Sequence, residues 1–524
     1  MLLKEEYQRF NSEKKLSQNE KRLTMILHPF IRRKDMIYCS LCGNAPCSEA
    51  CPKKLNPDKL LRSIWLDGEV HAAATLKESK KTCADCDAPC EKACLRSGLV
   101  SIKKLINKLQ DEVVPTLNIP LPDNYDRLKT DFCGIPLENP FLLSSSVVAS
   151  TYDTCSRAFD AGWAGAAFKT ICNFEIHETS PRFAAITGDS GSIVGFKNIE
   201  QLSDHSVEEN MEVFRQLKRD YPNKFILASI MGRNDEEWEY LSKICEQNGA
   251  DAIELNFSCP NMMDGNLGST IGQSQDLVER FTYASKKGTS LPVLAKLTPN
   301  IDSMNEVAEA AKRGGADGIA TINTIKSIMQ IDQNTYVSSP AVKNMSAVGG
   351  YSGNAVKPIA LRFIAELRNN PNLSKMYISG MGGIETWKDA LEFILLGSNS
   401  IQVTTAVMQY GYRIIDDLKD GLNYYLHKKG FSNIQEVIGL SLPYISDTTD
   451  VLERDTVVYP KFNRKTCIGC GRCQISCADG GHQAIRMENR KPILDPKKCL
   501  GCHLCVLVCP TDSITSSEKR VIKK

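Results

Sequence analysis

The 524-residue chain is too long for one ordinary domain, and its length alone predicts two to four. Its 64 Lys and Arg residues nearly cancel its 62 Asp and Glu residues, which excludes an overall field that would attract nucleic acid or an anionic membrane. The charged N-terminal segment lacks the apolar centre of a signal peptide, and no run of about 18 apolar residues occurs, so we expect a cytoplasmic protein without a membrane partner.

Cysteines divide the chain into three regions. Sixteen of the 21 fall into two terminal blocks, eight within 39–94 and eight within 467–509. A reducing cytosol disfavours disulfides, and the spacing does not fit a small secreted scaffold, so metal ligation is the better interpretation. Proline-bearing stretches near 112–128 and 441–460 separate the blocks from the middle of the chain. We therefore predict domains at 1–115, 125–440 and 455–524.

The first block reads CSLCGNAPCSEAC and CADCDAPCEKAC, with an Ala-Pro-Cys sequence in each half that suggests a pseudo-repeat. Its spacings, x2-x4-x3 and x2-x3-x3, are loose enough that zinc stays an alternative. Eight thiolates nonetheless match two [4Fe–4S] clusters without remainder. The surrounding segments have helical patterns, so we expect a small α domain with two clusters. The predicted ligands are Cys39, Cys42, Cys47, Cys51, Cys83, Cys86, Cys90 and Cys94.

Short apolar runs alternate with helical patterns through the middle region. Eight such runs occur: FLLSSS at 141, GAAFKT at 165, FILASIM at 225, DAIELNF at 251, LPVLAKL at 291, GIATINT at 318, MYISGM at 376 and SIQVTTA at 400. Eight strand–helix units predict an α/β fold, a (β/α)8 TIM barrel with its active site at the carboxyl ends of the strands. A doubly wound open sheet is the alternative.

Polar residues stand at the predicted strand ends, although barrel interiors prefer Val, Ile and Leu. For any single one, a local cap or a satisfied polar contact is as good an explanation as catalysis. Together they outline a polar ligand site. Its members are Lys169, Thr170, Asn256, Ser258, Cys259, Lys296, Asn323, Thr324, Thr404 and Thr405.

The segment ISGMGGIETW follows the seventh run, and TTAV lies in the eighth. Barrels commonly bind a phosphate on backbone N–H groups at this position, although a tight structural turn also explains the glycines. No G-x-G-x-x-G or G-x-G-x-x-A fingerprint opens a helix after a strand. We therefore find no site for NAD(P) or FAD, and we expect the primary electron donor to be another polypeptide.

The last block contains CIGCGRCQISC and CLGCHLCVLVCP, each with the C-x2-C-x2-C-x3-C spacing of a pair of [4Fe–4S] clusters. Zinc is the alternative, but four-cysteine zinc sites use two separate pairs. The fourth cysteine of each run ligates the other cluster in such folds. This groups Cys467, Cys470, Cys473 and Cys509 on one cluster and Cys499, Cys502, Cys505 and Cys477 on the other. Four low-potential clusters predict a path for single electrons, and a flavin commonly converts these to pairs.

Several long motifs carry a family resemblance. They are ENPFLLSS, FKT, KNIEQLSD, ELNFSCPN, LAKLTPN, ADGIATINT, GGYSGNAVKPIALR, GMGGI and QVTTAV. Through them, residues 125–430 resemble the FMN barrel shared by dihydroorotate dehydrogenases and dihydropyrimidine dehydrogenases. The two cysteine blocks resemble dihydropyrimidine dehydrogenase in particular, as a ferredoxin-like module at the C-terminus and an α-helical cluster domain at the N-terminus.

The resemblance implies reduction of the C5–C6 double bond of uracil or thymine, or the reverse. Cys259 would be the acid/base at C5, opposite the flavin N5 that exchanges hydride with C6; a thiol with a pKa near the working pH suits this role. The implied pyrimidine ligands are Asn198, Asn256, Ser258, Asn323 and Thr324, and the implied FMN contacts are Ser145, Lys169, Thr170, Lys296, Gly353, Gly382, Gly383, Thr404 and Thr405. It also groups Cys39, Cys42, Cys47 and Cys94 apart from Cys51, Cys83, Cys86 and Cys90.

The sequence departs from this family in two ways. The FAD and NADPH domains between the N-terminal block and the barrel are missing, which implies electrons from a separate FAD/NAD(P)H subunit or ferredoxin in a homodimer or hetero-oligomer. Asn261 stands where dihydroorotate dehydrogenases also have asparagine, which leaves the substrate open between uracil or thymine and orotate-like acids. A dihydroorotate dehydrogenase, or an electron-transfer subunit without its own substrate, are the alternatives.

Overall fold

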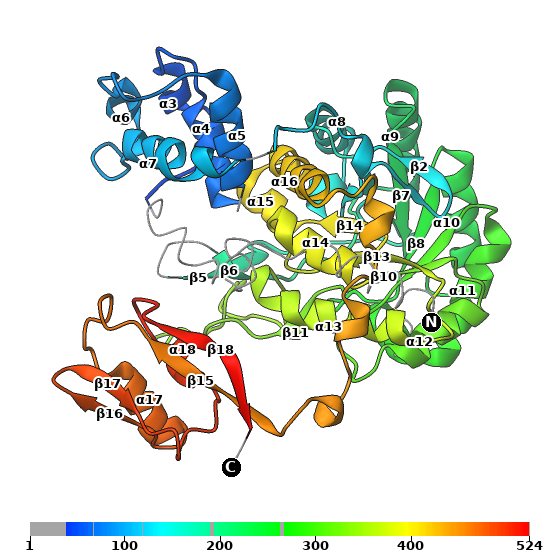
Figure 1. Ribbon diagram of the computed structural model, residues 1–524. Coiled ribbons are helices and arrows are strands. Elements are labelled where there is room, and N and C mark those ends of the chain that lie inside the picture. The colour runs from blue at the N-terminus through cyan, green and yellow to red at the C-terminus, as the bar shows by residue number, and fades with distance from the viewer. Residues whose placement is uncertain (1–37, 67, 118, 189–192, 263–266, 523–524) are drawn as a thin grey trace. The chain divides into compact units, whose positions relative to one another are not determined.

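The structure is a computed structural model that describes residues 38–66, 68–117, 119–188, 193–262 and 267–522 (Figure 1). The chain divides into two compact units, one ending at Ile445 and the other beginning at Ser446. Within the described ranges, no helix has both the length and the apolar character needed to cross a bilayer. The N-terminal segment that lacks a signal-peptide pattern lies outside the described residues.

Eight parallel strands form a closed barrel in the order β10-β13-β14-β3-β4-β7-β8-β9. Each predicted run supplies one strand, so the (β/α)8 barrel is confirmed and the open sheet is excluded. The ring closes where Ile401 pairs with Phe141. The strands are β3 (Phe141–Leu143), β4 (Gly165–Ala167), β7 (Phe225–Ile230), β8 (Ala252–Asn256), β9 (Val293–Lys296), β10 (Gly318–Thr321), β13 (Tyr377–Met381) and β14 (Ser400–Val403).

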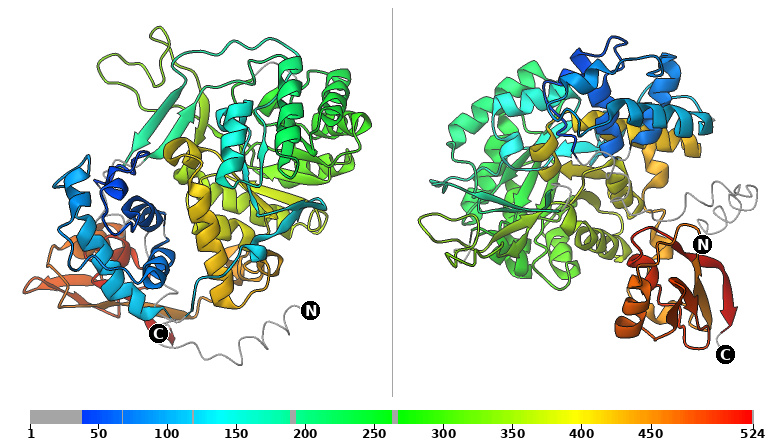
Figure 2. Two further views of the ribbon diagram at one scale, coloured as in Figure 1. Left: turned by 90° about the horizontal axis from the view of Figure 1, so that it is seen from above. Right: turned by 90° about the vertical axis from the view of Figure 1, so that its left-hand side faces the viewer.

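Amphipathic helices follow the strands and cover the outside of the barrel (Figure 2). Capping boxes at Thr151, Ser206 and Thr386 start three of them, because each side chain accepts a hydrogen bond from a backbone N–H of the first turn. The helices are α8 (Tyr152–Ala161), α9 (Val207–Asp220), α10 (Asp235–Gln247), α11 (Gln275–Gly288), α12 (Asn305–Arg313), α13 (Lys357–Asn369), α14 (Trp387–Leu395), α15 (Thr405–Tyr410) and α16 (Ile414–Lys429).

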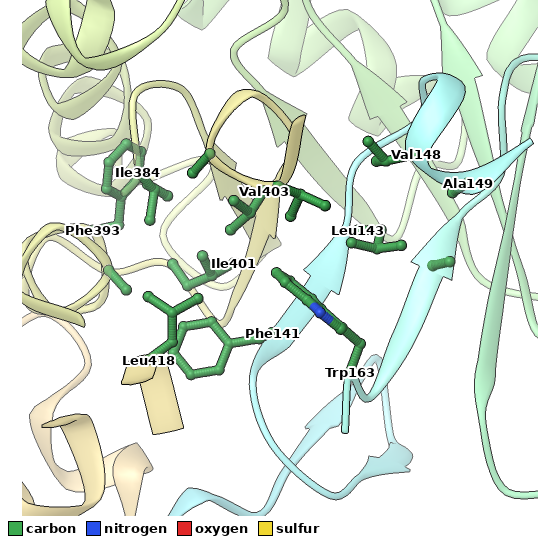
Figure 3. Packing of buried hydrophobic residues seen from close by; sticks show 14 of the residues in the cluster. Phe141, Leu143, Val148, Ala149, Trp163, Ile384, Phe393, Ile401, Val403 and Leu418 are labelled. Carbon is green, nitrogen blue, oxygen red and sulfur yellow. The ribbon is translucent and has the colours of Figure 1, made fainter. Parts of the chain in front are cut away.

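The main hydrophobic core lies between the strands and these helices. Phe141 of β3, Ile401 of β14 and Leu418 of α16 lie close together in it, with Trp163 alongside (Figure 3). The indole Nε1 of Trp163 donates to the Tyr412 carbonyl at 2.9 Å, so the core tryptophan also fixes the segment before α16. The strands are buried on both faces, which explains their nearly continuous apolar sequences.

Two additions lie outside the barrel sheet. A hairpin of β1 (Thr130–Phe132) and β2 (Ile135–Leu137) brings Phe132 against Phe225 and Tyr377, the first residues of β7 and β13, at ring-centroid distances of 4.5 and 4.6 Å. The sequence did not predict the second addition, an antiparallel sheet in the order β11-β12-β6-β5. Its strands are β5 (Phe183–Thr187), β6 (Ile193–Asn198), β11 (Ile325–Ser327) and β12 (Gly349–Ser352).

The N-terminal block is helical, as predicted. Its helices are α3 (Pro46–Glu49), α4 (Pro57–Trp65), α5 (Glu69–Ser79), α6 (Pro89–Ala93) and α7 (Ile102–Lys108). In both Ala-Pro-Cys repeats the alanine is left-handed, with φ of 41° at Ala45 and 53° at Ala88, and the proline starts a short helix. These helices share one compact unit with the barrel, and the predicted boundary near 115 stays a prediction.

The C-terminal unit pairs β15 (Thr456–Phe462) with β18 (Ile514–Ile522), and β16 (Ile485–Glu488) with β17 (Lys491–Leu494). Helices α17 (Arg472–Gly480) and α18 (Leu504–Leu507) each begin within a cysteine run. Its buried apolar cluster consists of Cys473, Ile485, Cys505 and Ile514. Short helical turns elsewhere are η2 (Leu109–Val113), η3 (Val114–Thr116), η4 (Asp126–Leu128), η5 (Val147–Ala149), η6 (Gly268–Gln273), η7 (Asn354–Val356), η8 (Ile434–Val437), η9 (Leu442–Tyr444) and η10 (Thr449–Val451).

Candidate active site

An open cavity lies at the carboxyl ends of the barrel strands, and the space within it, including the part open to solvent, is about 1090 Å³. This is the end at which barrel enzymes bind their ligands. Every residue that we predicted for the ligand site lines this cavity except Ser258. The predicted residues that line it are Ser145, Lys169, Thr170, Asn198, Asn256, Cys259, Lys296, Asn323, Thr324, Gly353, Gly382, Gly383, Thr404 and Thr405.

Ser258 lies behind the cavity wall, fully buried, and joins two of the asparagines. Its Oγ donates to Oδ1 of Asn256 at 3.1 Å and accepts from Nδ2 of Asn323 at 2.8 Å. Nδ2 of Asn256 in turn donates to Oγ1 of Thr170 at 2.8 Å. This network holds amides at the ends of β8 and β10 in fixed orientations, so that they present donors and acceptors to a ligand.

Cys259 follows Ser258 on the loop after β8, and only 6% of it is exposed. Burial raises the pKa of its thiol to about 11, and the backbone N–H groups of Asn261 and Met262 oppose that rise. We expected a pKa near the working pH, whereas burial keeps this thiol protonated at neutral pH. Cys259 is therefore set up to donate a proton. Part of its loop, residues 263–266, lies outside the described residues.

Lys169 is neutralised by two carboxylates that the sequence did not predict. Its Nζ lies 3.3 Å from Oε1 of Glu178 and 3.2 Å from Oε1 of Glu200. Burial raises the pKa of Glu200, and the Lys169 ammonium opposes that rise. Arg182 approaches the other oxygen of Glu178 at 3.8 Å. This side of the cavity therefore offers no surplus positive charge to an anionic ligand.

Lys296 lies in a second buried polar group. Its Nζ is 3.1 Å from Oε1 of Glu254 and donates to Oγ of Ser145 at 2.9 Å. Nε2 of Gln402 donates to the second Glu254 oxygen at 3.0 Å. The carboxylate of Glu254 is fully buried, and its two hydrogen-bond partners compensate for its desolvation. The pair fixes the ammonium of Lys296 at the cavity wall.

Two glycines of the GMGGI sequence form one end of the cavity. A Cβ at Gly383, where φ is 77°, would lie 2.8 Å from the backbone N of Lys357 and 2.9 Å from the Gly353 carbonyl. At Gly382, where φ is 123°, a Cβ would meet the Ala360 side chain at 3.0 Å. Both positions therefore require glycine, which accounts for the GMGGI sequence. Barrels commonly bind a phosphate at such a turn after the seventh strand, so the lining residues fit a phosphorylated flavin.

The thiols of the N-terminal block gather in two groups that match the predicted grouping. Cys39, Cys42, Cys47 and Cys94 surround one small cavity. In the other group, burial raises the pKa of Cys90 to about 11, with further increases from Glu91 and from the nearby thiols of Cys51, Cys83 and Cys86. Oε1 of Gln110 accepts from the backbone N–H of Cys83 at 3.5 Å, a neighbour that the sequence did not indicate.

The C-terminal cysteines gather in the crossed pattern predicted from their spacing. Cys467, Cys470, Cys473 and Cys509 line one cavity, and Cys477, Cys499, Cys502 and Cys505 line another. Among the described residues, no three His, Cys, Asp or Glu side chains converge closely enough to bind a single metal ion.

Comparisons with known proteins match the barrel and the C-terminal cysteine runs. Residues 127–426 match the family described as dihydroorotate dehydrogenase, and residues 461–516 match a 4Fe-4S dicluster domain. The NAD-dependent dihydropyrimidine dehydrogenase subunit PreA of Escherichia coli K12 is 53% identical over 69% of this chain and 88% of its own length.

More distant relatives span the same two activities. The chloroplastic dihydropyrimidine dehydrogenase (NADP(+)) of Arabidopsis thaliana is 39% identical over 61% of this chain and 78% of its own. The catalytic subunit of dihydroorotate dehydrogenase B (NAD(+)) from Pyrococcus abyssi is 37% identical over 60% and 99%. The crystal structure of DHODH from Eimeria tenella with ferulenol shares the fold, with a TM-score of 0.51 and 18% identity over 62% of this chain and 91% of that one.

Proposed function

Because this chain belongs to the dihydropyrimidine dehydrogenase-like iron–sulfur flavoproteins, which have a barrel of the dihydroorotate dehydrogenase family, we propose that it reduces the C5–C6 double bond of uracil or thymine, or catalyses the reverse. Its relatives are oxidoreductases that act on CH–CH groups. One observation carries the proposal: the buried thiol of Cys259 and the amides of Asn198, Asn256 and Asn323 line a single cavity.

The residues around that cavity have distinct tasks in this reaction. Bound FMN would exchange hydride between its N5 and C6 of the pyrimidine. The thiol of Cys259 donates the proton to C5, which its raised pKa allows at neutral pH. The glycine end would hold the FMN phosphate, and Lys296 would place a positive charge beside the ring. The other residues that would contact FMN are Ser145, Lys169, Thr170, Gly353, Gly382, Gly383, Thr404 and Thr405.

The substrate is recognised through its alternating N–H and C=O groups. Asparagine amides offer both a donor and an acceptor, which suits such an edge, and Thr324 adds a hydroxyl. Ser258 keeps Asn256 and Asn323 oriented without facing the cavity. The geometry therefore supports recognition of a pyrimidine ring through hydrogen bonds to its N–H and C=O groups.

The charges around Lys169 favour an uncharged pyrimidine over dihydroorotate. Dihydroorotate carries a carboxylate, which would need a free cation in a buried site. Lys169 already contacts Glu178 and Glu200, and Lys296 contacts Glu254. Asn261, which also lines the cavity, is the feature that favours the rival dihydroorotate reaction.

Electrons reach the flavin through [4Fe–4S] clusters in this proposal. Sixteen cysteines in four groups would hold four clusters, two at each end of the chain. The Escherichia coli relative is named as an NAD-dependent subunit, and this chain has no dinucleotide fingerprint. A separate FAD/NAD(P)H subunit or a ferredoxin therefore supplies the electrons in a homodimer or hetero-oligomer. The thiol-rich ends suit the reducing cytoplasm.

Anaerobic titration of the reduced protein tests the proposal. Uracil and thymine should reoxidise the flavin, and dihydroorotate should not reduce the oxidised protein efficiently. Cys259→Ala should lower turnover by about 10²–10⁴-fold, the usual contribution of a general acid, while the flavin stays bound. Cys172→Ala is the matched control, because Cys172 is also buried beyond a barrel strand and lies outside the cavity lining.

Two results would contradict the proposal. A preference for dihydroorotate would support the rival dehydrogenase. Unchanged turnover on every pyrimidine in Cys259→Ala, with flavin intact, would support an electron-transfer subunit without its own substrate.

A further inference from the structure

The two thiol groups of the C-terminal unit have different surroundings. The first C-terminal thiol group consists of Cys467, Cys470, Cys473 and Cys509, and the second consists of Cys477, Cys499, Cys502 and Cys505. Arg464 and Arg472 line the cavity of the first group, whereas the described lining of the second contains neither lysine nor arginine. Among the described residues, neither lining includes Asp or Glu. Only the first group therefore has fixed positive charges along its cavity.

Two further cations lie beside the first C-terminal thiol group. Arg490 lies in the turn between β16 and β17, and its Nη2 donates to the Ile468 carbonyl at 3.4 Å. Nζ of Lys491, the first residue of β17, donates to the Cys467 carbonyl at 2.7 Å. Gly469 allows this close approach, because a Cβ there would lie 2.6 Å from the Arg490 carbonyl. The β16–β17 turn thus adds two positive charges to the edge of this group.

The arginines around the first group have no counterion in the described part of the chain. All three are exposed, and no carboxylate forms an ion pair with Arg464, Arg472 or Arg490 there. Ion pairs with carboxylates are made instead by three other arginines of the unit, Arg454, Arg486 and Arg520. Over residues 446–524, Lys and Arg outnumber Asp and Glu by 14 to 9. Such an uncompensated patch attracts a negatively charged partner.

The same patch exposes an apolar side chain and a thiol. Ile468 lines the cavity of the first group and is 57% exposed, and Cys470 is exposed as well. A protein that contacts Ile468 would therefore come close to this thiol group. Weak electron-transfer complexes bury less than about 1,200 Å², so a contact of this small size is sufficient. Charge complementarity then provides the orientation and the high rate of association.

We propose that Arg464, Ile468, Arg472 and Arg490 form a docking face for a small acidic one-electron carrier protein. This inference rests on the proposed function, which requires a cluster at the first C-terminal thiol group and electrons from a separate protein. At each encounter the carrier is oxidised by one electron, and the cluster gains that electron. Carboxylates of the carrier pair with the arginines, and an apolar side chain of the carrier contacts Ile468.

An acidic flavodoxin, reduced to its hydroquinone, is the probe for the anaerobic full-length protein. Stopped-flow absorbance follows its oxidation to the blue semiquinone, which reports the transfer of one electron. The second-order rate constant should be large at low salt. It should fall at least about tenfold towards an ionic strength of 1 M, where the Debye length is only about 3 Å. A rate constant that does not depend on salt would overturn the charge assigned to the carrier.

Charge reversal locates the docking face. Arg464→Glu combined with Arg472→Glu should lower the rate constant at low salt by about 10–10³-fold, the range of electrostatic steering, and most of this difference should vanish near 1 M salt. The matched control combines Lys497→Glu with Lys498→Glu, because both lysines are exposed and directly precede Cys499 of the second group. The control should change the rate constant less than about threefold. Equal losses in the two variants would overturn the docking face.

A conservative variant keeps the test valid if the glutamate variant does not assemble its clusters. Arg464→Lys combined with Arg472→Lys retains both charges and should retain the salt dependence. Arg464→Gln combined with Arg472→Gln should lose most of it. If these two variants behave alike, the docking face is wrong.

Dithionite separates this inference from the proposed function, because it reduces clusters without a carrier protein. Absence of C-terminal cluster EPR signals from the dithionite-reduced protein would contradict the proposed cofactors, and this inference with them. Salt-dependent oxidation of the flavodoxin without any turnover of uracil or thymine would support the docking face and contradict the proposed reaction.

Discussion

The two cysteine-rich ends use the same ligand chemistry in different ways. At the C-terminus, two runs of identical spacing form a small unit whose buried apolar cluster is Cys473, Ile485, Cys505 and Ile514. At the N-terminus, the spacings are irregular, and the helices share a hydrophobic core with the barrel through residues such as Leu61 and Trp65. Local spacing determines the first arrangement, whereas packing against a second domain determines the other.

The contact between the N-terminal helices and α16 shows this dependence. Asp417 accepts from Nε of Arg62 and from Oγ of Ser63, at 2.5 and 2.7 Å, and its side chain is 1% exposed. Arg413, which precedes α16, donates from Nη1 to the Cys42 carbonyl of the first cysteine turn at 3.1 Å. The irregular spacing is tolerated because these tertiary contacts position the thiols.

The first prediction tests whether the folding of the two cysteine-rich ends depends on bound iron to different degrees. Anaerobic removal of iron should unfold residues 456–522, because half of their buried apolar cluster consists of cysteines and metal binding then supplies folding energy. Helices α4 and α5 should stay folded, since their core is continuous with the barrel. Hydrogen exchange measured by mass spectrometry should show complete loss of protection in the first region only. Equal loss in both regions would remove the distinction.

The second prediction concerns Cys259, a buried thiol of the barrel that belongs to neither cysteine-rich end of the chain. Burial raises its pKa to about 11, so oxidation of a dihydropyrimidine, which needs the thiolate, should speed up about tenfold per pH unit from pH 7 towards that value. Reduction needs the protonated thiol and should stay level over most of that range. Single-turnover flavin kinetics at each pH will measure both. A level rate of oxidation would contradict proton abstraction by Cys259.

The third prediction breaks the docking of the N-terminal helices. Asp417→Ala leaves the Arg62 cation buried without its closest carboxylate and should lower the free energy of unfolding by about 3–5 kcal/mol. Asp416→Ala is the matched control, because Asp416 is 44% exposed and lies 3.8 Å from the same arginine. That change should cost at most about 1 kcal/mol. Urea unfolding followed by tryptophan fluorescence will compare them, and equal losses would show that burial of the pair is unimportant.

The smallest expected effect concerns one hydrogen bond in the same contact. Tyr410→Phe removes the acceptor of the Trp65 indole and should cost about 1 kcal/mol in urea unfolding. Tyr336→Phe, at a position that is 83% exposed, should change nothing measurable. No difference between the two variants would mean that the docking depends on the charged pairs alone.

The sequence predicts the barrel well because each of its strands is a short apolar run between helical patterns. It misses the sheet formed by β5, β6, β11 and β12, whose strands are only partly buried and have mixed sequences. The crossed grouping of the C-terminal cysteines follows from their spacing alone. Residues at strand ends are predictable for the same reason, since parallel strands bring their carboxyl ends to one side.

The partners of the two lysines could not be predicted. Glu178 and Glu200 lie 9 and 31 positions from Lys169, and Glu254 lies 42 positions from Lys296. Each pair forms through tertiary structure: Glu254 and Lys296 meet on the paired strands β8 and β9, and Glu178 and Glu200 lie in the segments on either side of the inserted strands β5 and β6. The raised pKa of Cys259 is equally a property of burial, so a reference value for a free thiol could not supply it.

Ser258 has a consequence for how variants of this protein are interpreted. It touches no ligand surface, yet it is the only link described between the amides of Asn256 and Asn323 in the folded chain. Its loss would uncouple the two amides, leaving Asn256 held by Thr170 and Asn323 by Thr324. A screen scored by affinity would then count Ser258 among the contact residues. A map of this pocket drawn from mutational sensitivity alone would thus be larger than the surface that the pyrimidine meets.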